Sequence, residues 1–156
     1  MSIKTEQRNF SQLVSTSSNI SFKVPDFQRD FVWKTTGEVQ EFWQDIEEEF
    51  ASIKTNDSDP DFGMFLGNLI LCNPDNEKNT FQIIDGQQRI TTIFILLIAF
   101  RSNLKRLILE EKAKETSIER LIADINNILL FHDRDTGETV GTRFTAATSV
   151  KIIALL

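Results

Sequence analysis

The feature that most constrains the fold is the stretch at residues 81–106, which reads FQIIDGQQRITTIFILLIAFRSNLKR. A short apolar run, residues 81–84, is broken at once by Asp85 and Gly86, and a long segment with helical spacing follows. Apolar residues then recur at steps of three and four, as one face of an α-helix requires, at Ile90, Ile93, Phe94, Leu97, Phe100, Leu104, Leu107 and Ile108. The sequence therefore predicts a strand, a tight turn and a long helix, with polar groups gathered at the turn.

The predicted turn has the chemistry of an anion site. A helix N-terminus presents backbone N–H groups that have no intrahelical partner, together with the positive end of the peptide dipole. Gly86 permits the sharp turn and the close approach of a ligand. Arg89 can grip a phosphate with two parallel hydrogen bonds. Further amide and hydroxyl groups that can reach a phosphate oxygen or a bound metal are those of Gln87, Gln88, Thr91 and Thr92.

A structural interpretation of the same residues competes with this one. Asp85 followed three residues later by Gln88 has the form of a capping box with Asp85 as the N-cap, which alone would account for both residues. Capping does not account for Arg89 beside two glutamines. A carboxylate would also repel a phosphate, so Asp85 must either turn away or share a cation with the ligand. On chemistry alone both interpretations stay open.

A second candidate segment lies upstream, at residues 25–33, PDFQRDFVW. Residues 20–24 alternate apolar and polar side chains, which predicts a short strand ending at Pro25. Gln28 and Arg29 are candidate ligand residues, because an amide and a guanidinium just past a strand can meet a ligand held at the turn. The large aromatic side chains of this segment are expected to anchor the core or the loop rather than to stack on bases, namely Phe27, Phe31 and Trp33.

Periodicity and turn residues predict the remaining elements: weak helical spacing in residues 1–14, an amphipathic helix at 35–52, strands at 65–72 and 80–84 joined as an antiparallel hairpin, and a helix at 116–132. Thr35 and Glu38 form a candidate capping box. The helix at 116–132 is expected to pack on the long helix, and residues 133–141 to form a loop. The fold class is therefore α/β (α+β), a small mixed sheet with a hairpin and long helices. We expect one domain over 1–156, with a core at 20–110 and a helical extension at 116–132.

Composition excludes several classes of function. The 156 residues are 40% apolar, enough for one domain with a buried core. The net charge of -6 gives no overall basic footprint, so any contact with DNA must be local or supplied elsewhere. One cysteine, Cys72, and one histidine, His132, exclude a disulfide framework and a zinc site of several Cys and His within this chain. No apolar run reaches the ~20 residues of a membrane span and no signal segment is visible, so a cytoplasmic protein is expected.

Three blocks of sequence together resemble a known family. DGQQR at residues 85–89, leading into two threonines and a long apolar helix, resembles the signature of the GmrSD-type restriction endonuclease N-terminal domain, which has a ParB-like and sulfiredoxin-like fold. VPDFQRDFVW at 24–33 is similar to the upstream motif of that family, and FLGNLIL at 65–71 to the strand before DGQQR. The blocks occur in the family's order.

The resemblance implies a nucleotide-binding, NTP-hydrolysing domain of a phage-defence system that cleaves modified DNA. In that interpretation the catalytic residues are Asp85, Gln88 and Arg89. Arg89 and the backbone of residues 86–88 hold phosphates, Asp85 orients a metal ion or an attacking water, and Gln28 and Arg29 close the site. The implied cofactor is an NTP with a divalent cation, Mg²⁺, for which Asp85 is the tentative ligand. Sulfiredoxin uses a cysteine at its phosphate turn, whereas this turn carries glutamines, so sulfur chemistry is not expected there.

Family members continue beyond such a domain, into an HNH-type nuclease domain or with a partner subunit that supplies it. We therefore expect no nuclease site here, and contact with DNA through that further part. The alternative function is a non-catalytic module that uses the same turn to bind a DNA phosphate or to dock a partner.

Overall fold

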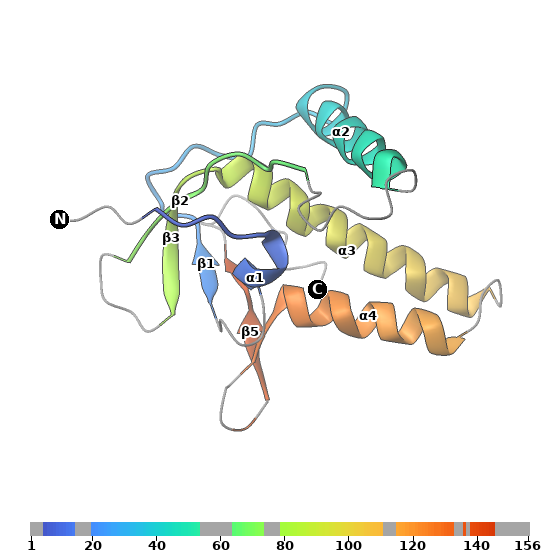
Figure 1. Cartoon of the computed structure of the whole chain (residues 1–156). Helices are drawn as coiled ribbons and strands as arrows, with labels where there is room; N and C mark the ends of the chain where they lie inside the picture. Colours follow the sequence, from blue (N-terminus) through green and yellow to red (C-terminus); the bar gives the residue numbers. More distant parts are fainter. Residues whose placement is uncertain are drawn as a thin grey trace.

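The computed structural model describes residues 5–14, 20–53, 64–73, 79–110, 115–132, 136 and 138–145. Its helices and strands run in the order α1 (Phe10–Val14), β1 (Ser21–Lys23), α2 (Glu38–Ile53), β2 (Ile70–Cys72), β3 (Thr80–Asp85), α3 (Gln87–Leu109), α4 (Glu115–Leu129), β4 (Leu130–His132), β5 (Thr139–Thr142) and β6 (Phe144–Thr145) (Figure 1). No described helix is both long enough and apolar enough to span a bilayer.

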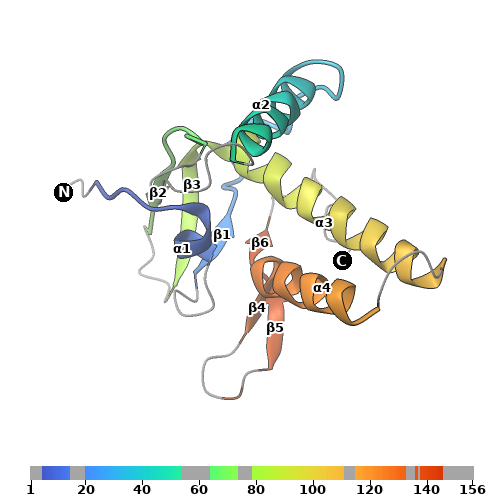
Figure 2. The ribbon, with the colours of Figure 1, turned by 45° about the vertical axis from the view of Figure 1, so that its right-hand side comes forward.

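The main sheet is mixed, with its strands in the order β2-β3-β1-β6. β1 runs parallel to both β3 and β6, while β2 and β3 form the antiparallel hairpin that the sequence predicts. β4 and β5 pair separately. Helices α3 and α4 lie side by side on one side of the sheet, and α2 lies apart from the sheet beside α3 (Figures 1 and 2). The mixed α/β class is confirmed, whereas kinship with the ParB-like and sulfiredoxin-like folds stays a prediction.

The core forms where the sheet meets the apolar face of α3. Phe94 of α3 packs against Phe144 of β6 with ring centroids 5.1 Å apart, and Phe22 and Ile83 are fully buried. Burying side chains of this size stabilises a fold by about 1.5–3 kcal/mol each. The remaining buried members of the cluster are Val14, Val24, Ile90, Ile98 and Leu129. The first part of the stripe predicted on the long helix therefore faces the core, at Ile90, Ile93, Phe94 and Leu97. Phe100 of the predicted stripe is instead 47% exposed, and Ile98, which lies outside that stripe, is buried.

The C-terminal part of the chain is tied into this core by Arg143, whose side chain is 0% exposed. Its guanidinium donates to the carbonyl oxygens of Ile128 at 2.9 Å, Asn127 at 3.2 Å and Ile20 at 2.7 Å. Its backbone N–H donates to the Leu129 carbonyl at 2.8 Å. Burial lowers the pKa of Arg143 from its ordinary value. One side chain thus joins the last turn of α4 to the start of β1.

Several predicted boundaries were wrong at their ends. The helix predicted at 116–132 ends at Leu129, and residues 130–132 form β4, because Arg143 takes up the carbonyl groups at the end of the helix. β5 occupies part of the loop predicted at 133–141. The strand predicted at 65–72 shortens to Ile70–Cys72, since Gly67 has a positive φ of 82° that interrupts an extended backbone.

The N-terminus of α2 also differs from its prediction. Helix α2 begins at Glu38, and the Glu38 Oε2 atom accepts from the backbone N–H of Lys34 at 3.1 Å rather than from that of Thr35. The carboxylate therefore reaches back one residue farther than in the predicted capping box, across a turn that includes Gly37.

Candidate functional site

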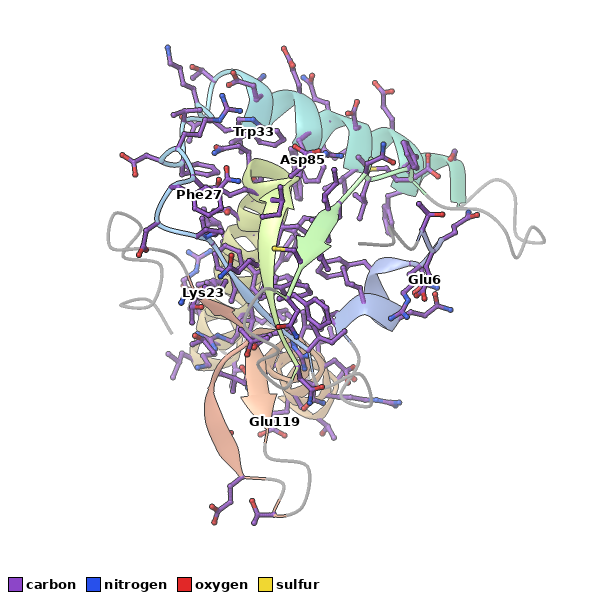
Figure 3. The ribbon with its side chains drawn as sticks, turned by 90° about the vertical axis from the view of Figure 1, so that its left-hand side faces the viewer. Glu6, Lys23, Phe27, Trp33, Asp85 and Glu119 are labelled. Carbon is purple, nitrogen blue, oxygen red and sulfur yellow. The ribbon has the colours of Figure 1, made fainter. Side chains whose placement is uncertain are left out.

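The three sequence blocks meet at one edge of the sheet. Because β1 and β3 are parallel, the segments that follow them, residues 24–33 and 86–89, leave the sheet on the same side. β2 is antiparallel to β3 with Ile70 opposite Asp85, so residues 64–69 arrive at that side too. Figure 3 shows Phe27, Trp33 and Asp85 toward one end of the molecule, with Glu119 at the other. Ligands of open α/β sheets bind at the carboxyl ends of parallel strands, and this is such an edge.

The turn itself is built by Gly86. Its backbone lies in the left-handed region, with φ 88° and ψ 6°, and it is the N-cap of α3 with no side-chain cap hydrogen bond. A Cβ atom here would lie 2.9 Å from Leu69 Cδ1 and 3.2 Å from the Asn68 carbonyl oxygen, so residues 68–69 pack directly on the glycine. The capping-box interpretation that the sequence left open is therefore excluded: Asp85 is the last residue of β3, and Gly86 is the N-cap of α3 with no side-chain cap hydrogen bond.

The glutamines of the turn bind the upstream loop rather than solvent. Gln87 Nε2 donates to the Arg29 carbonyl at 3.0 Å, and Gln88 Nε2 donates to the Asp30 carbonyl at 3.1 Å. Gln88 Oε1 accepts from the Val32 N–H at 2.9 Å. Both glutamines are only 7% exposed. The amide group of Gln88 is thus engaged at both ends, and its assignment as a catalytic residue stays a prediction.

The upstream loop makes the reciprocal contact. Gln28 Nε2 donates to the carbonyl oxygen of Ile84 at 2.9 Å, just before the turn. Gln28 therefore lies beside the DGQQR turn with its amide bound to the protein backbone, and its predicted contact with a ligand stays a prediction. Together with the bonds from the two glutamines, it holds residues 28–32 beside the start of α3.

Arg89 binds the third segment. Its Nη1 atom donates to the Leu66 carbonyl at 2.5 Å and its Nη2 atom donates to the Asn68 carbonyl at 2.8 Å. The same Nη2 atom lies 3.9 Å from Asp85 Oδ2. The guanidinium that the sequence assigns to a phosphate therefore already holds two carbonyl groups on either side of Gly67.

Thr91 and Thr92 lie inside the molecule, with exposures of 1% and 2%. Thr92 Oγ1 donates to the Gln88 carbonyl one turn earlier, at 2.9 Å. In this conformation a ligand at the surface would not reach either hydroxyl group, so their predicted role in binding phosphate or metal receives no support from the geometry.

Three side chains of the region remain open to a ligand. Arg29 is exposed, and its guanidinium has no partner among the described residues. The side chain of Asp85 is 61% exposed. Phe27 is 73% exposed, so it is not the core anchor that was one of its two predicted roles. The loop is instead anchored by Trp33, as predicted, whose ring packs on Phe42 of α2 with centroids 6.0 Å apart.

This arrangement suits an anion. The first backbone N–H groups of α3 and the guanidinium of Arg29 belong to segments that meet at this end of the sheet. The Asp85 carboxylate at the same place would repel an anion unless a cation lies between them. The described residues contain no group of three or more His, Cys, Asp or Glu side chains that could hold a metal ion. A magnesium ion nevertheless fits a single carboxylate such as Asp85, because Mg²⁺ is commonly bound through one or two carboxylates together with the phosphates of the substrate.

Sequence reasoning missed Gly67 and the backbone groups of residues 30–32. A Cβ atom on Gly67 would lie 1.6 Å from Arg89 Nη1, so the Arg89 guanidinium packs directly on the Gly67 backbone. The glycine of the FLGNLIL block was a visible signal. Its partner, however, lies on another element, and no local pattern identifies it.

Comparison with known proteins supports the family that the sequence resembles. The family model described as GmrSD restriction endonuclease, N-terminal domain, matches residues 10–148. The chain is also similar to the protein named Uncharacterized protein MJ0686 from Methanocaldococcus jannaschii, with 28% identity over 113 residues. That alignment covers 67% of this chain and 19% of the relative, so the chain corresponds to about a fifth of the relative's length.

Proposed function

This chain belongs to the family of GmrSD restriction endonuclease N-terminal domains, a component of restriction systems, and from that premise we propose that it binds and hydrolyses a nucleoside triphosphate. The NTP is bound with Mg²⁺ at the edge where β1 and β3 end. The domain would use this nucleotide within a phage-defence system that acts on modified DNA. DNA cleavage belongs to an HNH-type nuclease domain or subunit outside this chain.

The observation that carries the proposal is the uncapped first turn of α3 at the carboxyl edge of the parallel strands. Gly86 provides no side chain to occupy the first N–H groups of the helix. Such a turn attracts a phosphate through these N–H groups and the helix dipole. Arg29, from the neighbouring loop, adds a guanidinium that no described residue occupies. Phosphoryl transfer needs mainly positioning and neutralisation of charge, and these groups supply both.

Each residue has a distinct role in the proposed site. The backbone of residues 86–88 and the guanidinium of Arg29 bind phosphate oxygens, and Asp85 orients the attacking water or holds the cation that neutralises the phosphates. Gln28, Gln87 and Gln88 fix the loop that carries Arg29 through the hydrogen bonds described above. A bound Mg²⁺ would supply charge neutralisation at the phosphates.

The test is binding of ATP and GTP to the 156-residue chain, with and without Mg²⁺, for the wild type and Arg29→Ala. A hydrogen bond to a charged group contributes roughly 1.5–3 kcal/mol, so loss of Arg29 should weaken binding by about 10-fold or more. Arg120→Ala, which removes an exposed arginine from α4, is the matched control and should leave binding unchanged. Circular dichroism checks that all variants fold. Absence of binding by the wild type, or normal binding by Arg29→Ala, would contradict the proposal.

The exposure of Phe27 favours one second candidate. An exposed aromatic ring two residues from an exposed arginine also suits a segment of DNA, with a base on the ring and a phosphate on the guanidinium. In that case the domain is a non-catalytic DNA-binding or docking module. Binding of DNA would weaken steeply with added salt, whereas binding of Mg²⁺ and NTP would be saturable and much less sensitive to salt. A chain that binds neither ligand would favour docking of a partner.

A further inference from the structure

The guanidinium of Arg89 packs so closely on the backbone of Gly67 that it leaves no room for a side chain there. Gly67 has a φ of +82°, and an added Cβ atom would fall 1.6 Å from Arg89 Nη1 and 2.8 Å from Arg89 Cζ. No side chain other than that of glycine fits there while the guanidinium keeps its place. The guanidinium in turn spans the residue, because its two terminal nitrogens donate to the carbonyl groups of Leu66 and Asn68.

A second glycine completes the contact between the same two segments. Gly86, also at positive φ, leaves room for the Leu69 side chain and the Asn68 carbonyl oxygen at the turn. Residues 66–69 and the Asp85–Gly86 turn are therefore interlocked, with Arg89 seated on one glycine and Leu69 packed against the other. The Asp85 carboxylate lies beside these contacts, 3.9 Å from the Arg89 Nη2 atom.

We propose that Arg89 is a positioning residue that acts through Gly67. Its guanidinium packs on this glycine and binds the carbonyl groups on either side, a contact that we call the clamp, and the clamp fixes residues 66–69 against the turn and thereby sets the position of the Asp85 carboxylate. Arg29 is the cation that contacts the ligand. The claim about the ligand rests on the proposed function. The claim about the clamp formed by Gly67 and Arg89 does not.

The clamp requires the two terminal nitrogens of the Arg89 guanidinium, because each of them donates to a different carbonyl group. A guanidinium holds two carbonyl groups at once in a rigid plane, whereas an ammonium is a point charge that cannot reproduce that geometry. If Arg89 acted by its charge on a phosphate, Arg89→Lys would keep much of its effect. If it acts as a clamp, Arg89→Lys should behave almost like Arg89→Ala.

The test is a double-mutant cycle on the thermal midpoint of the 156-residue chain, using Gly67→Ala, Arg89→Lys and the pair. Each single change breaks the same clamp, so each should lower the midpoint by several degrees, and the pair should lower it by clearly less than the sum. Gly67→Ala combined with Arg29→Ala is the control, and these two effects should add. Additive effects of Gly67→Ala and Arg89→Lys would overturn the clamp.

A second measurement separates positioning from mere support of the fold. Amide NMR signals of residues 85–88 should move in Gly67→Ala and in Arg89→Lys, in the same direction, in variants that remain folded. In an assay of NTP hydrolysis, Arg89→Lys should have a kcat about 10-fold or more below that of the wild type with little change in KM, whereas Arg29→Ala should have a higher KM. Unmoved amide signals, or a loss of binding alone in Arg89→Lys, would overturn the positioning role.

The cycle and the amide signals need no nucleotide. A wild-type chain that binds no NTP would therefore defeat the proposed function, while the cycle would still decide whether Gly67 and Arg89 are coupled. Coupling together with NTP binding that depends on Arg29 is the combined result expected.

Discussion

The side-chain carbonyl of Gln88 accepts a hydrogen bond from the backbone N–H of Val32 at 2.9 Å, joining the first turn of α3 to a loop 56 residues earlier in the chain. The amide nitrogen of the same side chain donates to the Asp30 carbonyl. A single buried amide therefore satisfies one backbone donor through its oxygen and one backbone acceptor through its nitrogen.

Gln88→Glu should destabilise the protein. The carboxylate keeps the bond from Val32 but loses the donor to Asp30, and it places a charge at a residue that is 7% exposed. A buried partner left without its bond costs roughly 1–3 kcal/mol, and urea unfolding should show a loss of that order at pH 7. Gln44→Glu, an exposed position on α2, is the matched control and should change stability by no more than about 0.5 kcal/mol. Equal effects of the two substitutions would contradict this reading of Gln88.

Binding at Arg29 should be visible in tryptophan fluorescence. Trp33 lies at the end of the loop that carries Arg29 and packs on Phe42, so a ligand that orders this loop changes the surroundings of the indole ring. The chain has one other tryptophan, Trp43, which packs on Phe100 between α2 and α3. A titration with Mg²⁺ and NTP should change the emission of the wild type, and Trp33→Phe should remove most of that change. A signal that survives in Trp33→Phe would place the ligand elsewhere.

Removal of Arg143 should destabilise the protein strongly. Arg143→Met keeps the apolar length of the side chain but leaves the carbonyl oxygens of Ile20, Asn127 and Ile128 without their donor. We expect a loss of about 3 kcal/mol in the free energy of unfolding. Arg120→Met, on the exposed side of α4, is the control and should be nearly neutral. A nearly neutral Arg143→Met would show that these carbonyl groups find other partners.

The start of α2 should depend on pH through Glu38. Hydrogen bonds from its own backbone N–H and from that of Lys34 lower the pKa of Glu38 from its ordinary value of 4.5. Because the pKa is lower in the folded protein, the stabilisation is present above pH 4.5 and is lost as the pH falls through the lowered pKa. The midpoint difference between the wild type and Glu38→Gln should therefore shrink on acidification below pH 4.5. A difference that is constant from pH 7 to pH 3 would contradict the assignment.

Local patterns predicted the elements of this protein well, and their ends less well. Helix α3 forms over the predicted segment, and its apolar side chains at Ile90, Phe94 and Leu97 pack in or against the core, because apolar surface is stabilised by burial. The ends of the strand at Ile70 and of the helix at Leu129 depended on Gly67 and Arg143. Arg143 lies well beyond the helix that it ends, and Gly67, although close to Ile70, contacts Arg89 on another element, so a window along the chain does not contain the partners of either residue.

The candidate site, too, was determined partly by the sequence and partly by the tertiary structure. The sequence by itself determined that polar groups gather at the Asp85–Gly86 turn, that a helix starts there and that Gln28 and Arg29 follow a strand, since these facts depend on residue order and on backbone preferences. Only the tertiary structure decided which donors are free. Parallel pairing of β1 with β3 brought the carbonyl groups of residues 29–30 within reach of Gln87 and Gln88. Antiparallel pairing of β2 with β3 brought the carbonyl groups of Leu66 and Asn68 within reach of Arg89. A donor held inside the structure binds the acceptor that packing places beside it. The side chains of Arg29 and Asp85 stay exposed where these segments meet, and they are therefore accessible to a ligand.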